Sequence, residues 1–243
     1  MANRSILVPT LITLPAVIVL LGLGTWQVQR LGWKEALIAE RAAGLAAAPI
    51  RVPAAGATAE EVDFRRGTAT GRFRHDKEMY LTGRVRNGVA GHHVVTPLVL
   101  AGGAAVLVNR GWVPADRKDP ARRAAGQVEG TVSVTGILRA PGAKGRFTPD
   151  NDPDGNTWFH LDVPAMAAAA GLDGALPYVL DADGTANPGG LPVGGQTPTA
   201  LRNDHLQYAI TWFALAAALA VIYLLAIRKL SRERRADDPE SSH

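Results

Sequence analysis

The chain has 243 residues, enough for one or two domains, and a formal net charge of +4 from 26 Lys and Arg against 22 Asp and Glu. It contains no cysteine, which excludes disulfides, thiolate metal sites and cysteine nucleophiles. Much of the positive charge lies in a short C-terminal cluster, so the net charge indicates no nucleic-acid partner.

The first predicted element is a transmembrane helix over about residues 6–27. No charged side chain occurs from Ser5 to Gln29, and about 20 apolar residues suffice to cross the hydrocarbon core of a bilayer. A cleaved signal peptide is the alternative, but no small-x-small cleavage pattern follows the apolar run. Residues 1–30 are therefore expected to form a short cytoplasmic N-terminus and the first span.

Residues 31–203 are expected to form one exported α+β domain with a mainly antiparallel sheet or small barrel. A helix is predicted over 33–48, where Lys, Glu, Ala and Leu dominate before Pro49. Runs of β-type sequence alternate with glycine-rich turns, one of them at 101–103, and predict strands at 68–73, 78–82, 92–100, 104–113, 131–139, 157–161 and 178–180. A short helix at 164–170 breaks this series, and 187–196 is expected to be a flexible connector.

The second transmembrane helix is predicted over 204–228, where no charge occurs from Leu206 to Ile227. A buried core helix is the alternative. Five basic residues follow the apolar run and only Arg202 lies just before it, so the tail 229–243 is expected to be cytoplasmic: Arg228, Lys229, Arg232, Arg234 and Arg235. Two spans then place both termini in the cytoplasm and the domain in the periplasm. Because no Arg-rich, Ser-rich presequence precedes the first span, a bacterial inner membrane fits better than an organelle.

The exported domain carries few patterns typical of catalysis, so it is not expected to be an enzyme. It has no Gly-x-Ser-x-Gly elbow, no His-Glu-x-x-His and no phosphate-binding loop. His92 and His93 are adjacent in a predicted strand and point to opposite faces, which argues against one shared metal. Residues 150–155 imitate the start of a calcium loop, but Leu161 replaces the bidentate Glu, so a solvated acidic turn is favoured. The basic segment 117–123 fits a solvated loop, with anionic lipid or an acidic partner as alternatives.

Polar side chains gather at the outer ends of both predicted spans. His205 and Trp212 fall within about 20° of one helix face, and Tyr208 and Ala209 lie between them on that face. An aromatic belt at the membrane interface accounts for the Tyr and the Trp but not for His205. The matching end of the first span carries Trp26, Gln27 and Arg30. Interfacial anchoring, helix capping and a ligand site all remain open from these residues alone.

Five blocks of sequence follow one another along the chain. They are GTWQVQRLGWK (24–34), GHHVVTPL (91–98), VLVNRGWVP (106–114), NDPDGNTWFHLD (151–162) and NDHLQYAITW (203–212). In kind and order they resemble the Surfeit locus protein 1 family of cytochrome c oxidase assembly factors, and the chain is similar to a bacterial member. The resemblance covers about residues 20–228 and implies two spans around one external domain.

The resemblance also implies a function, namely binding haem a and presenting it to the large subunit of the oxidase. It assigns His205 as the candidate axial ligand of the haem iron and Trp212 as the second residue of that site. The implied partners are the oxidase large subunit, the haem a synthesis machinery and the lipid bilayer. One departure is His92, where an aromatic residue is common in the family. A scaffold that binds oxidase subunits through the external domain, without haem, is the alternative.

Overall fold

The structure, a computed structural model, describes residues 6–52 and 57–237. It contains two compact units, one formed by residues 1–39 and 200–243 and the other by residues 40–199. The first five residues of the expected N-terminus and the last six of the expected tail lie outside the described residues.

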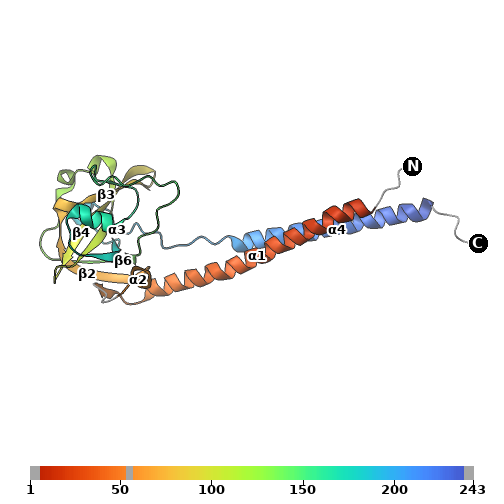
Figure 1. The fold of residues 1–243 in the computed structure, drawn as a ribbon, viewed down its shortest axis with the longest axis horizontal. Coiled ribbons are helices and arrows are strands. Elements are labelled where there is room, and N and C mark those ends of the chain that lie inside the picture. Colours follow the sequence, from red (N-terminus) through yellow and green to blue (C-terminus); the bar gives the residue numbers. More distant parts are fainter. Residues whose placement is uncertain (1–5, 53–56, 238–243) are drawn as a thin grey trace, which may run out of the picture. The chain divides into compact units, whose positions relative to one another are not determined.

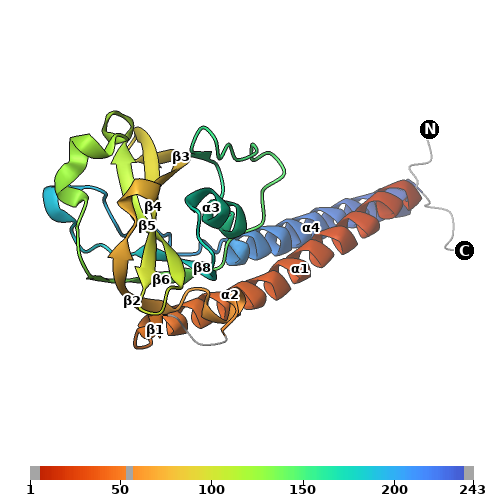
Figure 2. The ribbon, with the colours of Figure 1, turned by 60° about the vertical axis from the view of Figure 1, so that its left-hand side comes forward.

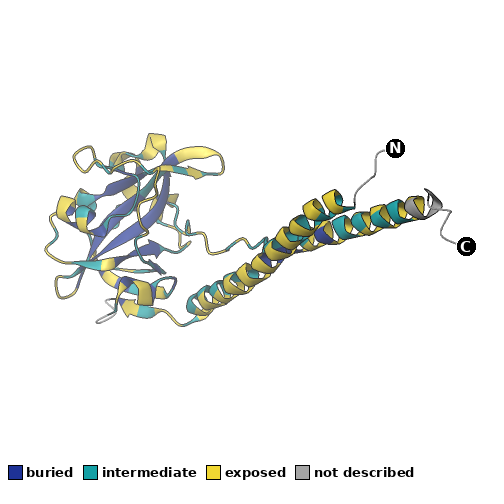
Figure 3. Cartoon of the chain, turned by 45° about the vertical axis from the view of Figure 1, so that its right-hand side comes forward, coloured by how far each residue is buried: buried dark blue, intermediate teal, exposed yellow. Residues whose placement is uncertain are grey.

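Two long helices form the first unit: α4 (His205–Asp237) and the part of α1 (Leu7–Ala46) up to residue 39. They lie side by side in Figures 1 and 2. Each has an 18-residue window that is long and apolar enough to cross a membrane, with mean hydropathy 2.3 in α1 and 2.4 in α4. Only 6% of each window is buried, and both long helices are coloured mostly exposed or intermediate in Figure 3. The core helix of a soluble protein would be mostly buried, so these helices indicate a membrane protein.

The first helix differs from the prediction in one respect, because α1 is continuous where two helices, 6–27 and 33–48, were expected. No proline interrupts the chain between Pro15 and Pro49. The polar residues that end the apolar run, including Gln27 and Arg30, are themselves compatible with a helix. The change from apolar to polar sequence near Gln27 therefore marks the end of the apolar part of α1 and not the end of the helix.

The second unit is built on one eight-stranded sheet in the order β1-β2-β6-β8-β5-β4-β3-β7. Figure 2 labels all of these strands except β7. The strands are β1 (Ile50–Val52), β2 (Arg66–Phe73), β3 (Met79–Arg86), β4 (Val89–Leu100), β5 (Ala105–Pro114), β6 (Val132–Arg139), β7 (Thr157–Trp158) and β8 (Ala175–Ala182). Because β2 also pairs with β4, the strands β2, β6, β8, β5 and β4 close into a five-stranded barrel. Each of these five strands therefore has a strand neighbour on both sides, whereas β1 and β7 remain the end strands of the sheet.

The pairing confirms the expected α+β architecture with a mainly antiparallel sheet. Only β1–β2, β3–β7 and β5–β8 are parallel. The predicted turn between β4 and β5 is a hairpin, with Gly103 N donating to Leu100 O at 3.1 Å. Besides the end of α1, the helices of this unit are short: α2 (Ala59–Val62), α3 (Val163–Ala170) and the 3-10 turns η1 (His75–Lys77), η2 (Ala115–Arg117), η3 (Pro120–Gly126) and η4 (Pro188–Gly190).

Strand β5 is buried on both faces and joins two apolar clusters. Val106 and Val108 belong to a cluster that includes Leu98, whereas Leu107 belongs to a cluster that includes Met166 of α3. All five side chains have a relative exposure of 0%. Burying each such side chain stabilises the fold by about 1.5–3 kcal/mol. A local cap sets the start of α3, where Ala165 N donates to Asp162 Oδ1 at 3.0 Å.

The segment 187–196, predicted as a flexible connector, is instead held against the barrel. Trp112 N donates to Val193 O at 2.9 Å, and Val193 N donates to Trp112 O at 2.8 Å. Gly111 makes this approach possible because its φ is +119° and a Cβ there would lie 2.0 Å from Val193 O. The connector therefore follows the barrel wall, which composition alone does not reveal.

Candidate functional site at the His205 end of the helix pair

The two predicted site residues both lie on α4, within the helical unit. His205 is the first residue of α4, and its Nδ1 lies 2.7 Å from Oε1 of Gln27 on α1. Trp212 is half-buried, and Ala209 between them has a relative exposure of 2%. His205, Ala209 and Trp212 thus follow the stripe of α4 that faces α1.

Small residues bring the two helices close together. Gly24 and Gln27 are the buried residues of α1, and Ala216 on α4 has a relative exposure of 3%. A Cβ at Gly24 would lie 2.7 Å from the ring of Phe213. Tight packing of this kind drives helix pairing in a bilayer, where apolar burial against lipid gives little.

A second polar contact marks the opposite end of the pair. Thr10 Oγ1 and Tyr223 Oη share a hydrogen bond of 2.7 Å. Thr10 and Gln27 are 17 residues apart on α1, which at about 1.5 Å per residue is ~26 Å. That span is close to the ~30 Å of a hydrocarbon core.

The ring of His205 can still accept a ligand. Among the described residues, Nδ1 bonds to Gln27 and no group hydrogen-bonds to Nε2. A neutral imidazole nitrogen is a common axial ligand of haem iron. Nε2 of His205 therefore fits the role of a haem iron ligand. Trp212 lies seven residues further along the same face of α4 and could contact the macrocycle.

The other polar residues near this end are less engaged with the site. Tyr208 was expected on the same face but is 54% exposed. The reason is that neighbouring helix residues point about 100° apart, so Tyr208 is turned away from the face on which Ala209 is buried. The Arg30 guanidinium lies 3.9 Å from the ring centroid of Trp33, and Arg202 pairs with Asp204. Both cations thus already have a partner on their own helix or flank.

The barrel histidines belong to the other compact unit and have partners of their own there. His92 Nδ1 is 3.4 Å from Thr82 Oγ1, and His93 Nδ1 is 3.4 Å from Asn109 Nδ2. Burial lowers the pKa of His93 to about 4, which keeps that ring neutral at physiological pH. Within residues 6–52 and 57–237, no three His, Asp or Glu side chains are grouped to hold a metal ion.

The acidic turn forms its contacts within the chain. Asp152 Oδ1 accepts from Gly155 N at 3.0 Å, and Asn151 Oδ1 accepts from Phe159 N at 2.8 Å. Asp150 pairs with Lys144. Side chains that bond back to nearby backbone in this way form turns, in agreement with the interpretation of 150–155 as an acidic turn.

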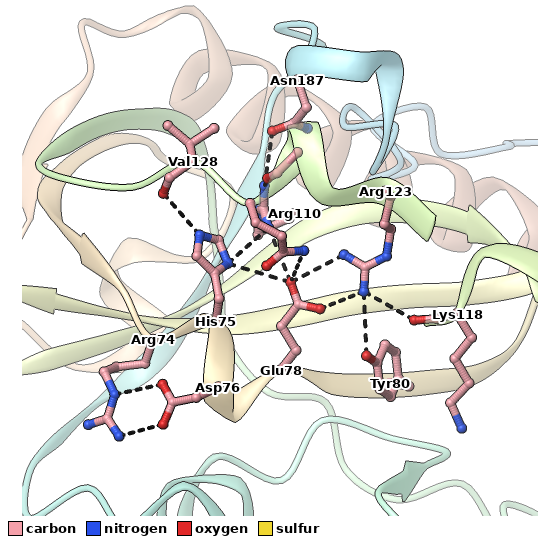
Figure 4. A network of polar contacts seen from close by, with 12 residues as sticks. Arg74, His75, Asp76, Glu78, Tyr80, Arg110, Lys118, Arg123, Val128 and Asn187 are labelled. Carbon is pink, nitrogen blue, oxygen red and sulfur yellow. Dashed lines mark hydrogen bonds and ion pairs between the residues drawn. The ribbon is translucent and has the colours of Figure 1, made fainter. Parts of the chain in front are cut away.

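The barrel unit contains a buried ionic network around Glu78 that the sequence patterns did not predict (Figure 4). Arg123 Nη2 lies 2.5 Å from Glu78 Oε2, and Arg110 Nη1 lies 3.2 Å from Glu78 Oε1. Gln127 Nε2 donates to the same Oε1 at 3.1 Å. One carboxylate thus faces two guanidinium groups, and all three charged side chains are at most 2% exposed.

The segment 117–123 was predicted to be a solvated loop, but one of its arginines is buried in this network. Arg117, Lys118 and Arg122 are at least partly exposed, but Arg123 turns inward and also donates to Lys118 O at 3.2 Å. Burial alone would raise the pKa of Glu78, but hydrogen bonds from His75 and Arg123 and the Arg123 charge outweigh it and hold that pKa at about 2. In the sequence, the buried network was indicated only by Arg110, a charged residue inside an otherwise apolar predicted strand.

Comparison with known proteins agrees with the sequence motifs. Residues 14–217 match the SURF1 family. The chain is 42% identical over 224 residues to a SURF1-like protein of Monosiga brevicollis, covering 87% of this chain and 85% of that one. It is 40% identical over 217 residues to Surfeit locus protein 1 of Mus musculus, covering 83% and 70%. The corresponding human protein is 38% identical over 218 residues, covering 83% and 72%. The chain belongs to the SURF1 family.

Proposed function

We propose that this protein assembles cytochrome c oxidase by binding haem a at the membrane edge and presenting it to the large oxidase subunit. Membership of the SURF1 family, known for cytochrome oxidase assembly factors, supports the role in assembly. The observation that carries the haem proposal is His205, whose Nδ1 is engaged by Gln27 while Nε2 has no partner among the described residues. His205 is the proposed iron ligand, and Trp212 is the proposed second residue of the site.

The position of this site suits the chemistry of haem a. Haem a carries a long isoprenoid tail, so a protein that takes it from lipid needs a ligand near the bilayer edge. His205 begins α4, and the exposed apolar residues that follow it, such as Leu206 and Ile210, belong in lipid. The protein would hold the haem with its iron at His205 and release it to the oxidase subunit.

We further propose a bacterial inner membrane location with both termini in the cytoplasm. In that topology residues 1–30 contain the first span, 31–203 the periplasmic domain, 204–228 the second span and 229–243 a basic cytoplasmic tail. The charge asymmetry around the second span supports this orientation. A reporter that is active only outside the cytoplasm should work within 100–190 and fail after Arg235. The reverse pattern would refute the orientation.

A scaffold that binds oxidase subunits without haem is the second candidate function. It is favoured by the compactness of residues 40–199, which form a closed barrel with their own apolar clusters. The haem content of the full-length protein separates the two candidates. Protein purified from cells that make haem a should show a Soret band if it binds haem, and its absence would favour the scaffold.

Three substitutions on α4 test the proposed ligand. His205→Ala should remove or greatly weaken haem a binding and leave membrane insertion intact, because Ala keeps the helix and costs no apolar content. Trp212→Phe should have a smaller effect, since an aromatic ring remains. Tyr208→Phe serves as the matched control, because Tyr208 is 54% exposed.

The measurement is the haem-to-protein ratio and the Soret position at equal expression. A plain aromatic belt predicts the opposite ranking, in which the Trp212 change matters most and the His205 change hardly at all. Wild-type haem content and spectrum in His205→Ala would disprove the site.

A further inference from the structure

Gln27 is the buried side chain that hydrogen-bonds to His205. Gln27 has a relative exposure of 9%, on a helix whose neighbouring residues Trp26 and Val28 are 54% and 48% exposed. A buried polar side chain in a membrane helix is costly unless it has a partner. Its partner is the ring of His205, at 2.7 Å.

The atoms in this contact fix the position of the proton. An amide oxygen can only accept a hydrogen bond, so Nδ1 of His205 is the N–H donor to Gln27 Oε1. In a neutral imidazole with a protonated Nδ1, the lone pair lies on Nε2. The contact therefore leaves Nε2 available as the ligand atom and holds the ring in one orientation.

We propose that Gln27 is the positioning residue for the haem ligand, acting through its hydrogen bond to His205 Nδ1. This inference rests on the proposed haem site. Histidines that bind metals usually donate their second N–H to a fixed acceptor, which sets the tautomer and makes the ring a better ligand. Here that acceptor comes from the other helix, so the haem site depends on the pairing of α1 with α4.

Four variants of the full-length protein in lipid nanodiscs test the inference. Gln27→Leu removes the acceptor and keeps a helix-forming side chain, whereas Gln27→Glu keeps an acceptor oxygen. Gln29→Leu makes the same chemical change two residues away at an exposed position. His205→Ala identifies the signals of His205 and tests the haem site itself.

The first readout needs no haem. Nitrogen-15 shifts of the histidine rings in haem-free protein report which nitrogen of His205 carries the proton. The wild type, Gln27→Glu and Gln29→Leu should all show His205 protonated at Nδ1, and Gln27→Leu should lose that preference. A wild-type His205 protonated at Nε2 would overturn the inference.

The second readout uses haem-loaded protein. Gln27→Leu should weaken haem binding about 10–100-fold, the usual cost of losing such a partner, and should lower the iron–imidazole stretching frequency of the ferrous form. Gln27→Glu should restore binding and raise that frequency, because a carboxylate is the stronger acceptor. A merely structural role for Gln27 would not shift the frequency in opposite directions.

The two proposals fail in different ways. If His205→Ala keeps its haem, the haem site is wrong and the role of Gln27 is refuted with it. If His205→Ala loses its haem but Gln27→Leu matches Gln29→Leu in tautomer, affinity and frequency, only the role of Gln27 is overturned.

Discussion

Replacing Glu78 by Gln should destabilise the barrel unit strongly and in a pH-dependent way. The change keeps the size and one acceptor oxygen of the side chain but removes the carboxylate that pairs with both Arg110 and Arg123. Both buried guanidinium groups then lose this counter-charge. Breaking a buried ion pair from one side typically costs about 3–5 kcal/mol.

The pKa of Glu78 gives an independent magnitude. Its fall from 4.5 to about 2 corresponds to about 3 kcal/mol, at ~1.4 kcal/mol for each tenfold change in the acid constant. Because the folded pKa is the lower one, this contribution is fully present above pH 4.5 and is lost as the pH falls towards 2. The two magnitudes agree, and domains of this kind have total stabilities of about 5–15 kcal/mol.

Urea unfolding of a fragment of residues 31–203 measures the effect through its tryptophan fluorescence, because Trp112 and Trp158 have relative exposures of 7% and 0% in the folded barrel. With slopes of about 1–3 kcal/mol per molar urea, the midpoint of Glu78→Gln at neutral pH should fall by about 1–3 M. Asp76→Asn is the matched control, because Asp76 pairs with Arg74 at the surface and should leave the midpoint nearly unchanged.

The difference between wild type and Glu78→Gln should shrink steadily below about pH 4.5 and vanish near pH 2. A loss below about 1 kcal/mol at neutral pH, or one that does not depend on pH, would show that the network contributes little to stability.

Three further predictions follow from the packing. Gly111→Ala should destabilise the barrel by more than the usual ~1 kcal/mol of a point mutation, because its Cβ would meet Val193 O at 2.0 Å at a φ of +119°; an unchanged melting temperature would contradict this. Gly24→Leu should displace the Phe213 ring from its contact with α1 and so separate the two helices. The measurement is a cross-link between cysteines introduced on α1 and α4, which this variant should lose. The fragment 31–203 should be soluble, β-rich by circular dichroism and unable to bind haem; tight haem binding by this fragment would place the site in the barrel.

Much of the fold could be predicted because the signals are local. Runs without charge identify both apolar helices, and alternating β-type runs with glycine turns identify most of the strands. The hairpin between β4 and β5 follows from its turn residues. The continuity of α1 could not be predicted in the same way, since a change from apolar to polar sequence looks like a boundary whether or not the helix ends there.

Barrel closure lies beyond local patterns. It depends on β2 pairing with β4 and on β5 pairing with β8, contacts between segments far apart in the chain. The ionic network has the same origin, because Glu78, Arg110 and Arg123 come from three different segments, and the contacts of the two guanidinium groups with Glu78 join them. Each charge alone resembles a surface residue, and only their assembly explains why burial is tolerated.

The sequence by itself determined the residue types of the candidate site and their place at the ends of the apolar runs. Charge and apolar length identified these two runs, and helical periodicity put His205 and Trp212 on one face. Only the tertiary structure decided that this face meets α1 at Gln27, at 2.7 Å, and that Tyr208 points away. The physical reason is that the pairing of two helices depends on how Gly24, Phe213 and the buried alanines fit together, and that fit is a property of the packed pair, absent from either helix alone.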